Sequence, residues 1–170
     1  LRVTMAVPSS AGCHDAFEMS KQLSVDAPNG FHLEFKVLPV ALPKNVTIGP
    51  GVTLLGPGDK CNYYAGVGPL GSQLYEEHNT PTATTRLLNA TPSLKPSEWN
   101  TVSIDVEGSG TARVVSLTIN GTPAFTKQKV DLPCQTANKI DHMSVGLFCV
   151  ERSLGVPVDL MFDDVLLTVP

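Results

Sequence analysis

Two pairs of adjacent carboxylic acids are the first residues in this sequence whose chemistry could be catalytic: Glu76–Glu77 and Asp163–Asp164. Hydrolysis of a glycosidic bond needs two carboxyl groups facing each other across the bond, about 5–5.5 Å apart for retention or about 6.5–9.5 Å for inversion. Neighbours on a regular strand point to opposite faces of the sheet, so neither pair can clamp one bond without a bulge. An enzyme is therefore the weaker expectation, and we assign no catalytic residue.

Nucleophilic and metal-assisted chemistry have equally little support. No G-x-S-x-G motif is present, and none of the four histidines has a context that suggests a catalytic triad. The four cysteines form no C-x-x-C pair, and no histidine stands at a metal-ligand interval from them. Asp163 and Asp164 are weak candidates for Ca²⁺, because hard cations prefer clustered oxygens. The competing interpretation is an aspartate late in a strand that hydrogen-bonds a neighbouring turn.

Aromatic and hydrogen-bonding residues gather between residues 62 and 86, and this mixture suits binding better than catalysis. Tyr63 and Tyr64 are adjacent, so a strand would place one ring on each face, and an exposed ring can stack on the apolar face of a sugar. Polar side chains that can hold hydroxyl groups follow closely. The predicted ligand-binding residues are Tyr64, Tyr75, Glu76, His78, Asn79 and Arg86, with Glu34 as a neighbour. The alternative is an ordinary polar face of a sheet.

Strands are the elements that must position these residues. Residues 31–38, FHLEFKVL, alternate apolar and polar side chains, which is typical of a strand with one side in the core. Residues 98–127 alternate in the same way and turn at EGSG and at Asn120-Gly121, which predicts a three-strand meander with antiparallel pairing between 99–106 and 113–119. Further strands are predicted at 1–6, 17–25, 46–55, 62–67, 72–76, 83–88, 143–150 and 158–169.

Helical patterns are nearly missing from the sequence. The stretches LKPSEW at 94–99 and TANKID at 136–141 predict single helical turns at most. Trp99, the only tryptophan, opens a core strand, so we expect it to be buried rather than to serve as a sugar platform. Many short strands with short connections predict one all-β domain over residues 1–170, an antiparallel β-sandwich.

Composition narrows the range of partners. The net charge is −4, and the basic residues are scattered singly, so we expect no nucleic-acid partner. No apolar run approaches the roughly 20 residues that cross a bilayer, so this segment is not expected to insert into a membrane.

Cysteine parity and three sequons favour a secretory route, and thus an extracellular or cell-surface location. The sequons are at Asn45, Asn89 and Asn120, although a Thr-rich chain also produces sequons by chance. Cys134 and Cys149 are close in sequence and are the first choice for a disulfide, which leaves Cys13 and Cys61 for each other. Four cysteines permit three connectivities, and buried free cysteines are the alternative.

Three segments together resemble the concanavalin A-like lectin and glucanase superfamily, including its laminin-G-like branch. They are NGFHLEFKVLP at 29–39, EWNTVSIDV with VSLTINGTPAF within 98–125, and MSVGLFCV with VPVDLMFDDVLLTV within 143–169. The last segment is also similar to the D-D-V ending of some carbohydrate-binding modules with a different jelly-roll topology.

The resemblance implies a jelly-roll sandwich with a ligand on the concave sheet or the loop rim, and related sandwiches often carry Ca²⁺ near that rim. It also implies a carbohydrate-binding or adhesive module whose partner is a glycan or a surface glycoprotein. The glucanase branch carries an E-x-D-x-x-E strand motif, which this sequence lacks. A glycoside hydrolase and a protein-recognition domain without a sugar site are the alternatives.

Overall fold

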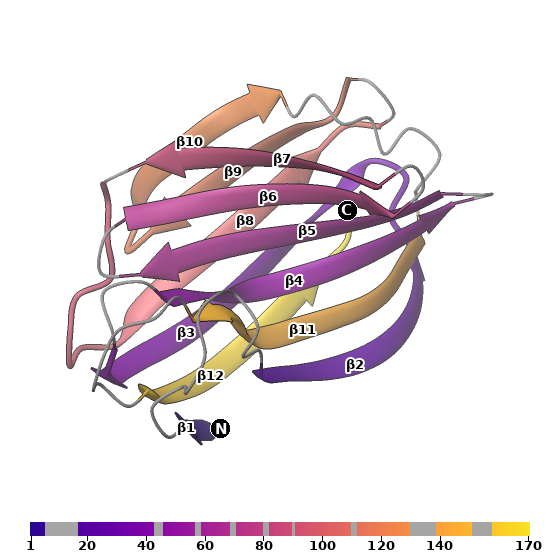
Figure 1. Ribbon diagram of the computed structural model, residues 1–170. Helices are drawn as coiled ribbons and strands as arrows, with labels where there is room; N and C mark the ends of the chain where they lie inside the picture. Colours follow the sequence, from indigo (N-terminus) through magenta and orange to yellow (C-terminus); the bar gives the residue numbers. More distant parts are fainter. Residues whose placement is uncertain are drawn as a thin grey trace.

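Alternation of apolar and polar residues gives strands almost wherever the sequence predicts them. The computed structural model describes residues 1–5, 17–42, 46–56, 59–68, 71–79, 82–89, 91–109, 112–129, 139–150 and 158–170. Within these ranges the chain forms two six-stranded sheets, stacked as a sandwich, in which every pairing is antiparallel (Figure 1). The prediction of an all-β antiparallel sandwich is confirmed.

Each sheet mixes early and late parts of the chain. Sheet A has the order β1-β12-β3-β8-β9-β10 and sheet B the order β2-β11-β4-β5-β6-β7. The strands of sheet A are β1 Arg2–Met5, β3 Gly30–Ala41, β8 Asn100–Glu107, β9 Val114–Ile119, β10 Thr122–Lys129 and β12 Val158–Thr168. Those of sheet B are β2 Phe17–Asp26, β4 Val46–Gly56, β5 Asp59–Gly68, β6 Gly71–Asn79, β7 Thr82–Asn89 and β11 Lys139–Val150.

The predicted meander is confirmed as β8, β9 and β10. Strands β8 and β9 pair in register from Val102 opposite Ile119 to Glu107 opposite Val114. The tight turn between β9 and β10 is made by Asn120 and Gly121, both with positive φ, of 52° and 74°. Asparagine and glycine tolerate this conformation best, which is why the pair marks a hairpin in the sequence.

The two stretches with weak helical patterns contain no α-helix in their described parts. Residues 94–99 contain a turn at Pro96–Ser97. The second stretch was misjudged because its last three residues, 139–141, begin β11. Residues 136–138 lie outside the described residues. No helix within the described ranges is long and apolar enough to cross a membrane.

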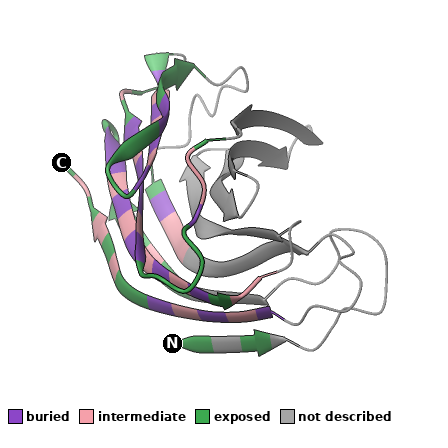
Figure 2. Ribbon diagram, turned by 90° about the vertical axis from the view of Figure 1, so that its left-hand side faces the viewer, coloured by how far each residue is buried: buried purple, intermediate pink, exposed green. Residues whose placement is uncertain are grey.

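The core lies against the inner face of sheet A, which curves around it (Figure 2). Phe31, Leu33, Phe35 and Val37 of β3 are buried in alternation with partly exposed polar residues. The ring of Phe35 lies 6.0 Å from that of Phe162 in β12, centroid to centroid. A slip of one residue would move this entire apolar set to the solvent face, so the alternation fixes the register of the sheet.

Trp99 is exposed, and the prediction that it is buried is wrong. Trp99 is 47% exposed to solvent, whereas the next residue, Asn100, is fully buried. The inward positions of β8 are Asn100, Val102, Ile104 and Val106, so Trp99 has the phase of the outer face. Asn100 tolerates the inward position because its amide is fully hydrogen-bonded there, which hydropathy alone does not reveal.

Candidate functional site

The most distinctive arrangement of the predicted binding residues is a row across three strands of sheet B. Tyr64 of β5 is paired with Tyr75 of β6, and Tyr75 is paired with Arg86 of β7. Neither pairing contains a register shift. Paired residues of an antiparallel sheet share one face, so these three positions are direct neighbours on the same surface.

The register also continues this row across the rest of sheet B. Gly51 of β4 pairs with Tyr64, Ser144 of β11 pairs with Gly51, and Ser20 of β2 pairs with Ser144. We call these six positions the sheet B row. Adjacent strands lie about 4.8 Å apart, so a row over six strands spans about 24 Å.

The buried residues of β11 decide which face the row occupies. Ile140 is fully buried, and Met143 packs against the core. Their partners in β4 are Leu54 and Val52, which in turn pair with Cys61 and Tyr63. The core-side positions of β5 are therefore the odd-numbered ones, and the sheet B row belongs to the face directed away from the core.

Glycine occupies several further positions on this outer face of sheet B. Gly49 and Gly146 are paired with each other in the row next to Gly51, and Gly66 lies two residues along β5 from Tyr64. Glycine within a strand often marks a place where a ligand approaches the backbone closely. Sequence reasoning missed these positions, although the alternation of GPG in β4 with GVG in β5 could have indicated them.

The register does not bring all the predicted binding residues together. Asn79 shares the face of Tyr75, because the two are an even number of residues apart on β6. Glu76 and His78 fall on the core-side face, where Glu76 pairs with Tyr63 and His78 pairs with Cys61. The predicted set is thus divided between the two faces of sheet B.

Glu34 belongs to the other sheet. It lies on β3 among the partly exposed residues of the outer face of sheet A, across the core from the sheet B row. Its carboxylate is 4.0 Å from Nε2 of His32, and Nδ1 of that histidine donates a hydrogen bond to Asp105 Oδ1 at 2.6 Å. Glu34 therefore has neighbours of its own and is not one of the residues around Tyr64.

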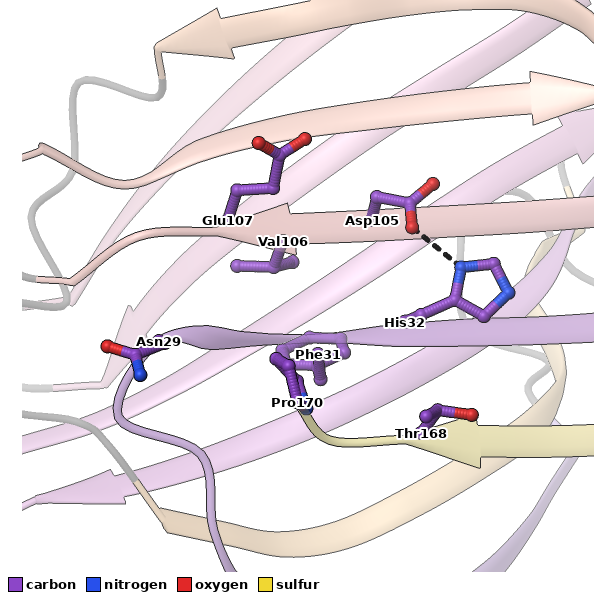
Figure 3. A pocket seen from close by; sticks show the side chains of 8 residues that line it. All are labelled: Asn29, Phe31, His32, Asp105, Val106, Glu107, Thr168 and Pro170. Carbon is purple, nitrogen blue, oxygen red and sulfur yellow. Dashed lines mark hydrogen bonds and ion pairs between the residues drawn. The ribbon is translucent and has the colours of Figure 1, made fainter.

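A shallow hollow of about 200 Å³ adjoins this histidine on sheet A (Figure 3). Its lining comes from three strand ends and the turn before β3, and comprises Asn29, Phe31, His32, Asp105, Val106, Glu107, Thr168 and Pro170. The pair of His32 with Asp105 resembles part of a hydrolytic triad. Among the described residues, Nε2 of His32 lies 4.0 Å from the Glu34 carboxylate, and no hydrogen bond joins it to a hydroxyl.

The residues suggested for calcium have other partners. A bulge in β12 gives Asp164 a φ of 48°, and the Asp163 carboxylate accepts a hydrogen bond from the backbone N–H of Asp164. Asp164 lies 2.5 Å from the Lys36 ammonium, which raises the pKa of Lys36 by hydrogen bonding and then by charge attraction. No group of three metal-ligating side chains is found in the part of the chain that the structure describes. These residues do not fit a calcium site.

Asn120 has a structural role in the hairpin. Its amide nitrogen donates to Asn100 Oδ1 at 2.9 Å, and its amide oxygen accepts from the backbone N–H of Thr101 at 2.9 Å. A glycan attached to this amide would disturb the turn, so the Asn-Gly-Thr sequence at this place is explained by folding. Asn45 lies outside the described residues, and Asn89 ends β7.

The predicted disulfides involve residues that the structure describes only in part. Cys13 and Cys134 lie outside the described residues, so both proposed pairs stay predictions. Cys61 belongs to β5 and Cys149 to β11, with β4 between the two strands.

Comparison with solved structures finds the same architecture in several proteins. A SAP-like pentraxin from Limulus polyphemus matches 98% of this chain and 74% of its own, with a TM-score of 0.55 and 11% identity. A structure from work on endo-acting O-glycanases of human gut microbiota matches 93% and 77%, with a TM-score of 0.57 and 11% identity. An alginate lyase from a Chlorella virus matches 84% and 72%, with a TM-score of 0.56 and 12% identity.

Sequence comparisons add nothing to these structural matches. No family model matches the chain, and no curated protein matches it. At such low identity the structural likeness establishes the architecture and leaves the activity open. The two antiparallel sheets and these matches show that the chain has the jelly-roll fold of the concanavalin A-like proteins.

Proposed function

We propose that the protein is a carbohydrate-binding or adhesive module whose binding surface is the sheet B row. The observation that carries the proposal is the register that places Tyr64, Tyr75 and Arg86 side by side on the face away from the core. Tyrosine rings offer an apolar surface with a polar edge, and arginine offers several donors for hydroxyl or carboxylate oxygens. The same fold occurs in a pentraxin, in an alginate lyase and in a structure from a study of O-glycanases. These matches support a carbohydrate-related role.

The direction of the row indicates the shape of the ligand. It runs across the strands, from the tyrosines over Gly51 toward the serines of β11 and β2. A glycan chain lying across the strands would thus meet tyrosine and arginine positions at one end, a glycine position in the middle and serine positions at the other end. This favours a chain of several sugars over a single terminal sugar.

We propose that this module acts outside the cell or at the cell surface. The even number of cysteines supports that location, and disulfides linking Cys134 to Cys149 and Cys13 to Cys61 form part of the proposal. Peptide mapping under non-reducing conditions that found all four thiols free would contradict both the disulfides and the location.

The test compares single substitutions on the two faces of sheet B. A glycan array, repeated with and without Ca²⁺, identifies a ligand, and titration calorimetry then measures its affinity for each variant. Tyr64→Ala and Arg86→Ala are expected to weaken binding at least tenfold, as loss of a central contact commonly does. Their thermal midpoints are expected to change little, because substitutions away from the core usually have small effects on stability.

Two control variants make the result specific. Tyr63→Ala, next to Tyr64 but at a core-side position, is expected to lower the thermal midpoint with little loss of affinity in the folded fraction. Lys129→Ala removes an exposed positive charge on sheet A, at the end of β10, and should bind as the wild type does. If Tyr64→Ala and Arg86→Ala both bind as wild type, or both unfold, the site is not on the sheet B row. A hydrolysis assay on any ligand found separates a lectin from an enzyme.

A further inference from the structure

Trp99 is the feature that the sheet B row leaves unexplained. It is the only tryptophan in the chain, and nearly half of its side chain is exposed to solvent. Within the described residues its indole N–H has no hydrogen-bond partner, and its ring contacts no other ring or cation. A large apolar ring with a free donor is thus presented to solvent at the start of β8.

The backbone holds this ring in a fixed place. The buried amide of Asn100 accepts a hydrogen bond from Lys95 N at 2.9 Å and donates to the carbonyls of Lys95 and Glu98 at 3.0 and 2.8 Å. Ser97, with a φ of 57°, donates its N–H to Pro39 O in β3 at 2.9 Å. The exposure of Trp99 therefore results from an anchored turn, not from a loose loop.

Apolar residues of two neighbouring strands extend the surface beside Trp99. Val37 of β3 pairs with Asn100, and Ser97 donates its N–H to Pro39 O, so Trp99 belongs to the segment that runs beside Leu38. Leu38 pairs with Met161 of β12. Val40, two residues along β3 at an irregularity of its pairing with β12, is 43% exposed. We call Trp99, Leu38, Met161 and Val40 the sheet A strip.

The charges around the sheet A strip argue against an anionic ligand. Arg2 is paired with Asp159 at 2.6 Å, Lys36 with Asp164 at 2.5 Å, and Lys95 with Glu98 at 3.8 Å. These three cationic side chains of the described residues are thus already paired with acids. A phosphate, sulfate or uronate would have to displace one of these partners, whereas an uncharged ligand would not.

The size of the strip argues against another protein as its occupant. Stable protein interfaces use about 20–30 residues on each side, and four partly exposed side chains are far short of that. A half-exposed indole is matched in size by one sugar ring, whose axial C–H groups form an apolar face. We propose that the sheet A strip is a second binding site, in which Trp99 stacks on an uncharged hexopyranose of a glycan chain.

This site does not depend on the sheet B row, because the two surfaces lie on opposite sides of the core. With both sites occupied, one copy of the protein would bridge two glycan chains. The single tryptophan also makes the second site directly observable, since all indole fluorescence comes from Trp99.

The experiment is a fluorescence titration of the full chain with neutral hexasaccharides of gluco, manno and galacto configuration, and with a hexa-uronate of equal length. A saturable change of Trp99 emission is expected with at least one neutral hexasaccharide and not with the hexa-uronate. The Tyr64→Ala plus Arg86→Ala double variant should give the same curve. The double variant thus separates the two proposals: loss of binding at the sheet B row leaves the Trp99 signal unchanged, whereas the absence of that signal counts against the sheet A strip alone.

Calorimetry on that double variant supplies the matched comparison. Adding Trp99→Ala should weaken the remaining binding about tenfold or more, as loss of a central aromatic contact does. Adding Leu166→Ala instead, which removes another exposed apolar side chain of sheet A outside the strip, should leave the affinity unchanged. The proposal is overturned if no neutral hexasaccharide changes the emission, or if Trp99→Ala binds as the double variant does. It is also overturned if the emission follows protein concentration instead of sugar, which would make the strip a contact between copies.

Discussion

Asn100→Ala tests the anchor that joins the β-sheet core to the exposed tryptophan. The buried amide makes four hydrogen bonds: its oxygen accepts from Lys95 N and from Asn120 Nδ2, and its nitrogen donates to Lys95 O and to Glu98 O. All four donor–acceptor distances lie between 2.8 and 3.0 Å. Alanine removes both the oxygen and the nitrogen of the amide, so all four partner groups lose their hydrogen bond to residue 100.

The expected cost follows from the number of bonds and the exposure of the partners. Each hydrogen bond contributes about 1 kcal/mol, so four would contribute about 4 kcal/mol if every partner stayed dry. Lys95, Glu98 and Asn120 are exposed residues, so water can replace part of the loss. We expect Asn100→Ala to lower the free energy of unfolding by about 2–3 kcal/mol.

Urea unfolding followed by circular dichroism measures this difference. Thr101→Ala, one residue along β8 and on the opposite face, is the matched control and should stay within about 0.5 kcal/mol of wild type. A loss of less than about 1 kcal/mol for Asn100→Ala would refute the reasoning, because it would mean that the four hydrogen bonds together contribute little to stability.

The remaining predictions concern a turn and an ion pair. Gly30 has a φ of 111°, and a Cβ there would lie 1.8 Å from the backbone oxygen of Val106. Gly30→Ala should therefore lower the free energy of unfolding by on the order of 3 kcal/mol or more, measured by the same urea unfolding assay. A loss within the range of ordinary surface substitutions would contradict this expectation. The hydrogen bond from Arg2 lowers the pKa of Asp159, so the pair stabilises the fold above the ordinary carboxyl pKa of about 3.9, and this contribution is lost as the pH falls through the lowered value. The thermal midpoint of the wild type at pH 7 should therefore be slightly higher than that of Asp159→Asn, and this difference should disappear in acid. A difference that grew in acid would mean that the pKa of Asp159 is raised by folding, which would contradict the prediction.

Turn chemistry and alternation accounted for most of the strands because both are local. The Asn120-Gly121 pair could be assigned to a hairpin from residue types alone, since few residues tolerate positive φ. The positions of β3 and β8 followed from alternating residues such as Leu33 and Ile104, which are buried as expected, although β3 extends three residues beyond the predicted end. The stretch 139–141 was misjudged because a short segment carries too little pattern to separate a turn from the start of a strand.

The candidate site was predicted only as a region, because its division between faces is not a local property. Alternation shows that Tyr75 and Glu76 lie on opposite faces, but it does not show which of them faces the core. Ile140 and Met143, far along the chain on β11, decide this through the register of β4 and β5. Glu34 was grouped with Tyr64 because the strand order is not visible in the sequence. The strand order assigns Glu34 to the other sheet.

The sequence by itself determined the class of fold, the strands and the hairpin turns, because short-range sterics and period-two burial govern them. Only the tertiary structure decided that Trp99 faces solvent, that Asn100 is buried in its place, and that the sheet B row runs unbroken from β7 to β2. The physical reason is that a strand's alternation has two possible phases. The choice between them depends on contacts with residues distant in sequence, which bury one face and leave the other for a ligand.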